Sequence, residues 1–226
     1  MNARANKVAE LLALESENYL KAGNKMGEEE LEKNLDELVS LLSYVNGKDV
    51  FEAFYKKYLS KRLLLNRSHS EEAERMMIMK LKPECGNQFT NKLEGMFKDI
   101  SVSEELTSQF KKISTFNLSF KMQVLTAGSW PFYKEYPIIL PPIFLDPQQQ
   151  FQKFYLEKHD GRKLSWLYSL SMCVVNAFFD KGKKFLSVSM FQSIVLLLFN
   201  QHTQISFKQF QEFTNLGRSF SKLFCF

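Results

Sequence analysis

The residue types that most often catalyse reactions or bind metal ions are few in this chain and stand far apart. The three histidines and three cysteines are His69, His159, His202, Cys85, Cys173 and Cys225. No carboxylate or nucleophile accompanies the histidines at a spacing typical of an active site. The odd number and wide spacing of the cysteines favour neither a disulfide framework nor a zinc site. The sequence therefore predicts a protein that is not an enzyme, with no catalytic residue, no metal and no cofactor.

Two short basic segments offer binding chemistry instead. Residues 158–163 read KHDGRK and residues 181–184 read KGKK, and both are predicted to be turns of one hairpin. Basic turns are most often simply solvated, and the functional alternative is a contact with an acidic partner. The residues predicted for that contact are Arg162, Lys163, Lys181, Lys183 and Lys184. Aromatic residues among these charges leave a basic nucleic-acid-binding module as a second, less favoured function.

The charge is unevenly distributed along the chain. Residues 1–113 hold 18 Lys and Arg against 19 Asp and Glu, a net of −1, whereas residues 114–226 hold 12 against 6, a net of +6. Apolar residues make up 45% of the chain, enough for a packed core, and no apolar run is long enough to cross a bilayer. The N-terminal segment is too acidic for a secretory signal, and the cysteine pattern suits a reducing compartment. We therefore expect no membrane partner and a location in the cytoplasm, the nucleus or both.

The elements that position these groups are helical in the first half of the chain. Two apolar series keep the spacing of a helix face: Leu31, Leu35, Leu38, Leu42 and Val45, then Phe51, Phe54, Tyr55, Tyr58 and Leu59. Asp49 is expected at an N-cap, after a left-handed Gly47, and the S-x-x-E patterns at Ser68 and Ser101 predict two more helix starts. Pro83 is expected to mark a helix end. The short connections predict an antiparallel bundle.

Strand patterns appear in the second half. The expected elements are a strand at 116–126, a short helix around 151–155, a hairpin of 164–179 and 185–188, and helices at 190–200 and 207–213. The strands are predicted from alternation and from β-forming residues, and the hairpin from its turn DKGK. Trp166 is expected to alternate with Leu164 and Tyr168 on one strand face that packs inward. The fold class is therefore α+β.

Six segments resemble the cullin family, in the same order along the chain. They are DVFEAFYKKYLSKRLL from Asp49, the pair Cys85-Gly86, KLEGMFKD from Lys92, VLTAGSWP from Val124, KHDGRKLSWLYSLS from Lys158 and FQSIVLLLFN from Phe191. The resemblance covers almost the whole chain, which makes it more specific than any single motif. Some segments are more similar to the cullin 4 type and others to the cullin 1 type, so no subfamily is assigned.

The resemblance implies a fold and a function. The fold would be a partial four-helix bundle at residues 1–113, an α/β subdomain at 114–189 and an incomplete winged-helix start at 190–226. The function would be that of a non-catalytic scaffold of a cullin-RING ubiquitin ligase, which supports ubiquitin-dependent protein degradation. In this family a RING-box protein adds a strand to an open sheet edge, which offers unpaired N–H and C=O groups. The residues expected there are Phe120, Gln123, Leu125, Leu164, Trp166 and Tyr168.

The resemblance also indicates which cullin features are missing from this sequence. Full-length cullins carry repeats that bind substrate adaptors and a second winged helix with the lysine that accepts a ubiquitin-like modifier. Neither is recognised here, so we expect no adaptor binding and no neddylation lysine. A ubiquitin-conjugating enzyme with an acidic segment would be the partner of the basic turns. A truncated scaffold, a decoy that sequesters the RING-box protein and a gene product without function all stay open.

Overall fold

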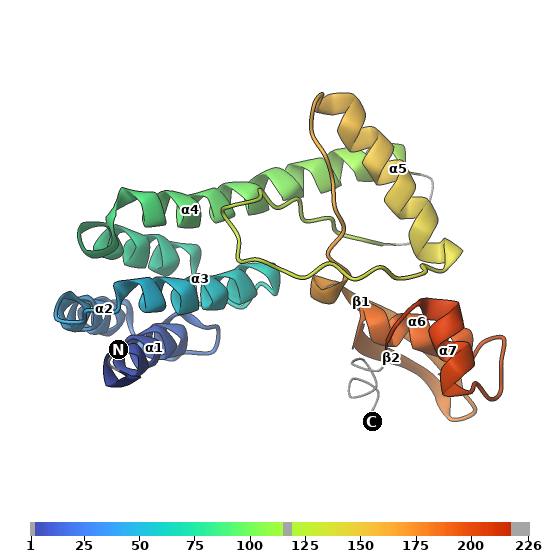
Figure 1. Cartoon of the computed structure of the whole chain (residues 1–226), viewed down its shortest axis with the longest axis horizontal. Coiled ribbons are helices and arrows are strands. Elements are labelled where there is room, and N and C mark those ends of the chain that lie inside the picture. The colour runs from blue at the N-terminus through green and yellow to red at the C-terminus, as the bar shows by residue number, and fades with distance from the viewer. Residues whose placement is uncertain (1–2, 115–118, 218–226) are drawn as a thin grey trace. The chain divides into compact units, whose positions relative to one another are not determined.

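The computed structural model describes residues 3–114 and 119–217 (Figure 1). These residues form two compact units, one of residues 3–113 with 119–132 and one of residue 114 with 133–217. Seven helices and one two-stranded antiparallel sheet lie in the described part, which confirms the α+β class. The expected domains at residues 1–113, 114–189 and 190–226 stay a prediction. None of the described helices is long and apolar enough to span a membrane.

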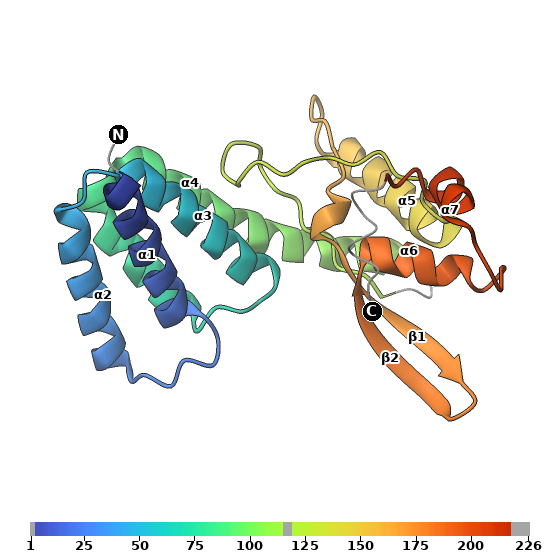
Figure 2. The ribbon, with the colours of Figure 1, turned by 60° about the horizontal axis from the view of Figure 1, so that its bottom comes forward.

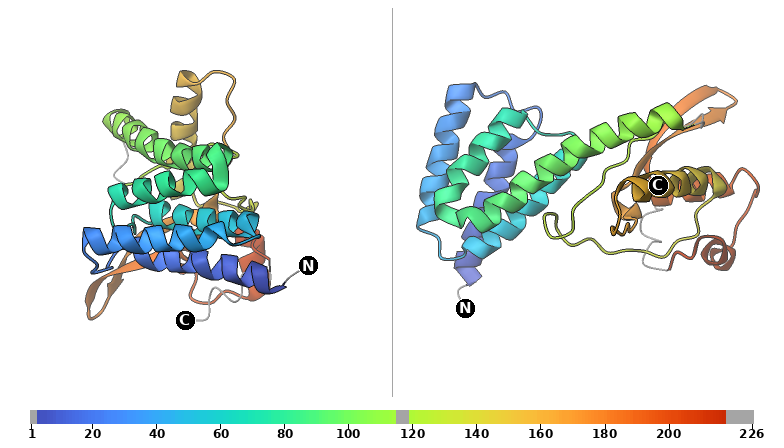
Figure 3. Two further views of the ribbon diagram at one scale, coloured as in Figure 1. Left: turned by 90° about the vertical axis from the view of Figure 1, so that its left-hand side faces the viewer. Right: turned by 90° about the horizontal axis from the view of Figure 1, so that it is seen from above.

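Four helices build the first unit. They are α1 (Ala3–Leu20), α2 (Glu28–Ser43), α3 (Lys48–Leu64) and α4 (Glu71–Ile113). Both α1 and α4 pack against α2 and α3, as Figure 3 shows. The four leucines of the series predicted for α2 are buried, whereas Val45 lies after the end of that helix and is half-buried. On α3, Phe51, Tyr55 and Leu59 are buried, and Phe54 and Tyr58 are half-buried. The bundle therefore follows from the 3.6-residue apolar period.

Two helix starts differ from their prediction. Gly47 is the N-cap of α3 with φ −106°, so it is not left-handed, and no side chain caps that helix. Asp49 lies inside the first turn, where a negative charge still stabilises the positive end of the helix dipole. At the start of α4 the capping side chain is Ser70, whose Oγ accepts from Ala73 N at 3.0 Å. Ser68 instead donates to Glu74 at 2.8 Å.

Helix α4 is one element interrupted by a break. Its backbone is non-helical at Gly86, with φ 78° and ψ 166°, a conformation open to glycine but strained for other residues. Pro83 lies three residues before the break and is tolerated within the last turn before it. The helix then continues through Ser101, so the predicted start there was wrong. Ser101 is exposed on a helix that was already running.

The second unit carries the sheet. Its elements are α5 (Pro142–Lys158), a short 3-10 helix (Tyr168–Leu170), β1 (Met172–Phe179), β2 (Gly182–Ser189), α6 (Met190–Leu198) and α7 (Phe207–Thr214). The strands pair in register from Met172 with Ser189 to Phe179 with Gly182, around the predicted turn. A core of Phe191, Phe210 and Leu216 joins α6, α7 and the segment after α7. The predicted hairpin and both helices after it are confirmed.

The predicted strand at 164–171 is absent. Residues 164–167 have no regular structure, and Tyr168–Leu170 forms a 3-10 turn before β1 begins. Leu164, Trp166 and Tyr168 are each half-buried and do not share a strand face. The Trp166 ring lies edge-on to Phe151 at 6.4 Å, so it packs on α5 instead of in a sheet.

Candidate partner-binding surfaces

Residues 119–126, which were predicted to be a strand, form no strand and bond to a helix instead. Residues 116–118 of that prediction lie outside the described residues. Met122 N donates to Thr107 Oγ1 at 3.2 Å, and Val124 N donates to Ser103 Oγ at 2.8 Å. Thr107 Oγ1 donates back to Met122 O at 3.0 Å. Two hydroxyl groups of α4 thus replace a neighbouring strand.

The match between helix and extended chain has a geometric reason. Four helical residues rise by about 6 Å and two extended residues by about 6.6 Å, so hydroxyls at i and i+4 meet extended residues at j and j+2. Ser103 and Thr107 are both buried, which leaves their hydroxyls no bulk water to bond. The two side chains therefore provide hydrogen-bond partners for backbone groups of Met122 and Val124, which are themselves half-buried.

A carboxylate fixes the end of this segment to the same helix. Asp99 accepts from Thr126 N at 2.6 Å, from Thr126 Oγ1 at 2.8 Å and from the indole nitrogen of buried Trp130 at 2.7 Å. A Cβ at Gly95, one turn earlier, would lie 2.8 Å from the Ser129 hydroxyl, so only glycine fits without a shift. The segments KLEGMFKD and VLTAGSWP thus hold each other in place.

The alternate backbone groups of this segment make no hydrogen bond to the described part of the chain. In an extended chain the N–H and C=O groups of successive residues point to alternate sides. Met122 and Val124 point theirs toward α4, so Lys121, Gln123 and Leu125 point theirs away. Within the described ranges, no hydrogen bond involves the backbone of these three residues. We call Lys121, Gln123 and Leu125 the free edge.

A buried ion cluster supports the bundle beneath these contacts. Arg62 is 1% exposed and donates from Nε and Nη2 to the carboxylate of Glu74, which is fully buried, and from Nη1 to Glu17. Burial lowers the pKa of Arg62, but the hydrogen bond and charge of Glu74 raise it more, so the guanidinium stays protonated. Ser68 supplies one further donor to Glu74. Sequence reasoning missed this cluster because its members lie in three different segments.

The β1–β2 hairpin exposes apolar side chains. Phe178 and Phe185 are both more than two thirds exposed, on the same face of the two strands. The Lys183 ammonium lies 4.9 Å from the Phe185 ring centroid and 5.5 Å from that of Phe178, which is cation–π geometry. Lys183 therefore covers two rings of its own hairpin.

The predicted basic residues fall in two places. Arg162 and Lys163 follow α5, not the hairpin, and Arg162 Nη1 donates to Tyr155 Oη at 3.0 Å. Lys181 lies in the hairpin turn and Lys184 on β2, both exposed. Figures 1 and 2 show the end of α5 and the hairpin turn at opposite ends of the second unit. The prediction that both segments flank one hairpin was wrong, because the strand begins eight residues later than expected.

The remaining candidate chemistry is weak in the described part of the chain. No group of three or more metal-ligating side chains occurs there.

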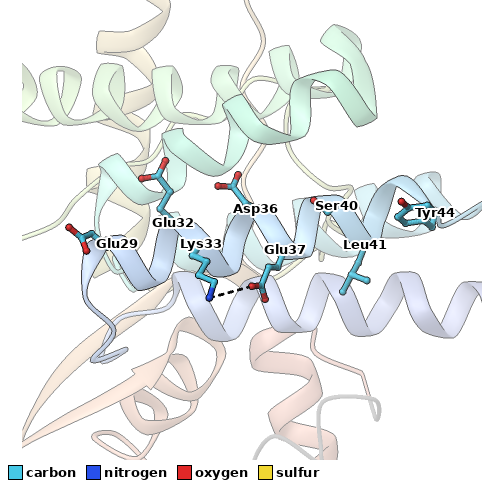
Figure 4. A pocket seen from close by; sticks show the side chains of 8 residues that line it. All are labelled: Glu29, Glu32, Lys33, Asp36, Glu37, Ser40, Leu41 and Tyr44. Atoms are coloured by element: carbon cyan, nitrogen blue, oxygen red, sulfur yellow. Dashed lines mark ion pairs between the residues drawn. The ribbon is translucent and has the colours of Figure 1, made fainter.

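Burial and, to a smaller extent, the charge of nearby Glu52 raise the pKa of the Cys85 thiol to about 12, so Cys85 is a neutral thiol and a poor nucleophile. The pocket in Figure 4 is lined by side chains of α2 and Tyr44 directly after it, including the ion pair of Lys33 with Glu37. With walls from a single helix, it is an open surface groove.

Comparison with known proteins adds an independent finding. The sequence matches the family model of the cullin alpha solenoid domain at residues 1–107 and that of the cullin alpha+beta domain at residues 124–221. It is 49% identical to Cullin-4 of Dictyostelium discoideum over 96% of this chain and 28% of that protein. It is 44% identical to human Cullin-4A over 100% of this chain and 31% of that protein, and 39% identical to rice Cullin-1 over 92% and 29%.

The chain belongs to the cullin family. It spans less than a third of the length of the cullins just named. The cullin resemblance of the quoted segments is thereby confirmed, and the structure gives two of them a physical role: KLEGMFKD and VLTAGSWP meet at Asp99 and Gly95. The hydroxyls of Ser103 and Thr107 were not predicted as site residues. The spacing S-x-x-x-T, followed in the sequence by an alternating segment, is the only signal that could have predicted the role of these two hydroxyls.

Proposed function

We propose that this cullin chain is a non-catalytic scaffold part of a cullin-RING ubiquitin ligase and that it binds a RING-box protein by strand addition. The observation that carries the proposal is the free edge at Lys121, Gln123 and Leu125. The family and the names of the relatives support the scaffold role in general. The position of the partner strand rests on the geometry of residues 119–126.

The free edge suits strand addition for a physical reason. An incoming strand needs a row of backbone donors and acceptors on every second residue, held in an extended conformation. Bonds to Ser103, Thr107 and Asp99 hold the segment extended before any partner arrives. Because the conformational entropy is already lost, a partner strand gains its hydrogen bonds at a smaller cost.

The side chains predicted around this edge are placed as follows. Phe120 packs on Phe110 of α4 at 5.5 Å, the Gln123 amide donates to Leu64 O at 3.4 Å, and Leu125 is half-buried. We propose that these side chains flank the added strand. Tyr168 donates from its hydroxyl to Gln148 at 3.0 Å, and its role in binding, like that of Leu164 and Trp166, stays a prediction.

The finer parts of the function are also proposals. Contact of an acidic ubiquitin-conjugating enzyme would use either Arg162 and Lys163 or the hairpin lysines, since the two groups are separate. A role in protein degradation, a decoy role, the expected absence of adaptor binding and a cytoplasmic or nuclear location are likewise untested predictions. A basic nucleic-acid-binding module would need one continuous basic surface, which the separated clusters do not favour.

A binding experiment with matched variants tests the edge. The variant Gln123→Pro removes one N–H of the free edge and is compatible with an extended backbone. The control Gln123→Ala removes the side chain but keeps the N–H. In a pull-down with a purified RING-box protein, we expect the wild type and Gln123→Ala to bind and Gln123→Pro to bind at least about tenfold more weakly, the equivalent of one lost hydrogen bond.

The outcomes separate the two parts of the proposal. If no form of the chain binds under conditions that capture a complete cullin, the scaffold function is wrong. If Gln123→Pro binds as well as Gln123→Ala, the RING-box protein uses another surface and the assigned edge is wrong. Far-ultraviolet circular dichroism of all three proteins establishes that the bundle is folded in each.

A further inference from the structure

The two faces of the β1–β2 hairpin differ in burial. One face carries Cys173, Val175, Ala177, Leu186 and Val188 in addition to residues at the turn, and these five are half-buried or buried. The other face carries Met172, Val174, Asn176, Phe178, Lys183, Phe185 and Ser187, all seven exposed, and Ser189 at its open end, which is half-buried. We call this second set the outer face. Its apolar members are not covered by any described part of the chain.

The outer face is large for an exposed apolar surface. Met172, Val174, Phe178 and Phe185 are 57%, 68%, 79% and 67% exposed. Since an aromatic side chain has an area of about 150–250 Å², Phe178 and Phe185 expose roughly 300 Å², and Met172 and Val174 bring the exposed apolar area to roughly 500 Å². A contiguous apolar patch of that size usually marks a site of association.

We propose that the outer face is a self-complementary interface with a second copy of this chain. The two hairpins pack face to face, and the turn of each lies over the open end of the other. The proposal concerns a surface that the proposed RING-box function does not use, so the two can succeed or fail independently.

The available area fits a weak dimer. Two copies of the outer face bury about 1,000 Å² in total, which is near the lower limit for a specific protein interface. Two sheets pack face to face at a separation of about 10 Å, which leaves room for one layer of interdigitated side chains from each copy. A two-fold axis closes such a contact at two copies, so no larger assembly is expected.

The orientation follows from the charges. With the turn of one copy over the open end of the other, Lys183 faces the partner's Ser189. The two lysines are then separated by about six strand residues, or roughly 20 Å, which exceeds the screening length of about 8 Å at physiological salt. Turn-on-turn packing would instead bring the two ammonium groups together.

The same orientation pairs complementary side chains. Phe178 of each copy lies opposite the partner's Met172, an arrangement that permits a sulfur–aromatic contact. Phe185 lies opposite the partner's Ser187, beside the partner's Val174. In the single chain Lys183 covers both rings. Its ammonium must move to the rim of the dimer interface when the two copies meet, and this requirement opposes association. Its long alkyl stem allows this shift.

The backbone edges of the hairpin remain available in such a dimer. Hydrogen bonds of a strand lie in the plane of the sheet, whereas the outer face is perpendicular to it. Residues 119–126 of the first unit take no part in the contact.

Sedimentation velocity of the full chain tests the proposal. We expect a reversible monomer–dimer equilibrium between about 1 and 100 μM, the range typical of a small interface. The double variant Phe178→Ser, Phe185→Ser should be monomeric throughout. The control Tyr44→Ser changes an aromatic residue directly after α2 that is 86% exposed, and it should dimerise like the wild type. Lys183→Met should tighten the dimer by roughly threefold to tenfold.

Each result supports or overturns the proposed dimer. A wild type that stays monomeric at 100 μM overturns the proposal and leaves the outer face to a different protein. A dimer that persists in the double variant, or an assembly larger than two copies, also overturns it. If the double variant fails to fold, as judged by circular dichroism, the Lys183→Met variant takes its place: tighter association supports the outer face, and unchanged or weaker association contradicts it.

Discussion

The Arg62 cluster and the β1–β2 hairpin place charged and apolar side chains in opposite ways. In the first unit a guanidinium and a carboxylate are buried with their hydrogen bonds satisfied. In the second unit two phenylalanines are exposed, and Lys183 of the same hairpin lies over their rings. Both arrangements depart from the usual pattern of apolar inside and charged outside.

The difference indicates which region supports and which region binds. A buried ion pair is costly to form and strongly destabilising to break, so it stabilises one arrangement of helices against small changes. Exposed aromatic residues add little to the stability of the free chain beyond the Lys183 contact, and they are free to be covered by another surface. We therefore infer that the helical bundle stabilises the fold and propose that the hairpin binds another surface. The free edge combines both properties, because the bundle holds it in place and its backbone groups are proposed to bind a partner.

The largest effect is expected from the buried cluster. Arg62→Ala leaves the Glu74 carboxylate buried without its cation, which should cost about 3–5 kcal/mol of unfolding free energy in a urea titration. Arg75→Ala is the matched control, because Arg75 pairs with Glu71 where both side chains are 60% exposed. That exposed pair should contribute less than about 1 kcal/mol. Equal losses in the two variants would contradict the supporting role of the Arg62 cluster.

An intermediate effect is expected where the extended segment meets α4. Ser103→Ala removes the acceptor of the Val124 N–H, which should cost about 1–3 kcal/mol because that donor is left without a partner. Ser101→Ala is the control two residues earlier on the same helix, where the side chain is exposed. Its unfolding free energy should change by less than about 0.5 kcal/mol. If Ser103→Ala is equally harmless, the hydroxyl does not hold the segment.

The smallest effect is expected at the hairpin. Phe178→Ser should change the unfolding free energy of the monomer by less than about 0.5 kcal/mol, because the ring is already exposed. Phe191→Ala, in the core of the same unit, should cost about 3–5 kcal/mol. Thermal unfolding at low concentration measures both. A large loss from Phe178→Ser would mean that the outer face is part of the folded core.

Sequence reasoning predicted the helices better than their ends. The leucines of α2 and the aromatic face of α3 follow a period that only one geometry satisfies, so they were placed correctly. The capping boxes were misplaced because many S-x-x-E patterns occur by chance. The two boxes that the structure does contain use glutamine, at Ser189 with Gln192 and at Ser206 with Gln209.

The candidate site was predicted only in part. The alternation of residues 116–126 predicted a strand, and residues 119–126 form none, because alternation does not reveal whether a strand or the hydroxyls of a helix lie beside the segment. The Arg62 cluster and the pairing of Gly95 with Ser129 join residues far apart in sequence, and no local pattern reports such contacts. The apolar outer face was not predicted, since period 2 shows two faces but not which one is covered.

Residue-level hydrogen exchange tests the free edge most directly. In the free chain the amides of Met122 and Val124 should exchange slowly, and those of Lys121, Gln123 and Leu125 quickly. Addition of a RING-box protein should slow the exchange of the latter three and leave the former two nearly unchanged. A complex that forms without slowing the exchange of Lys121, Gln123 and Leu125 would contradict strand addition at this edge.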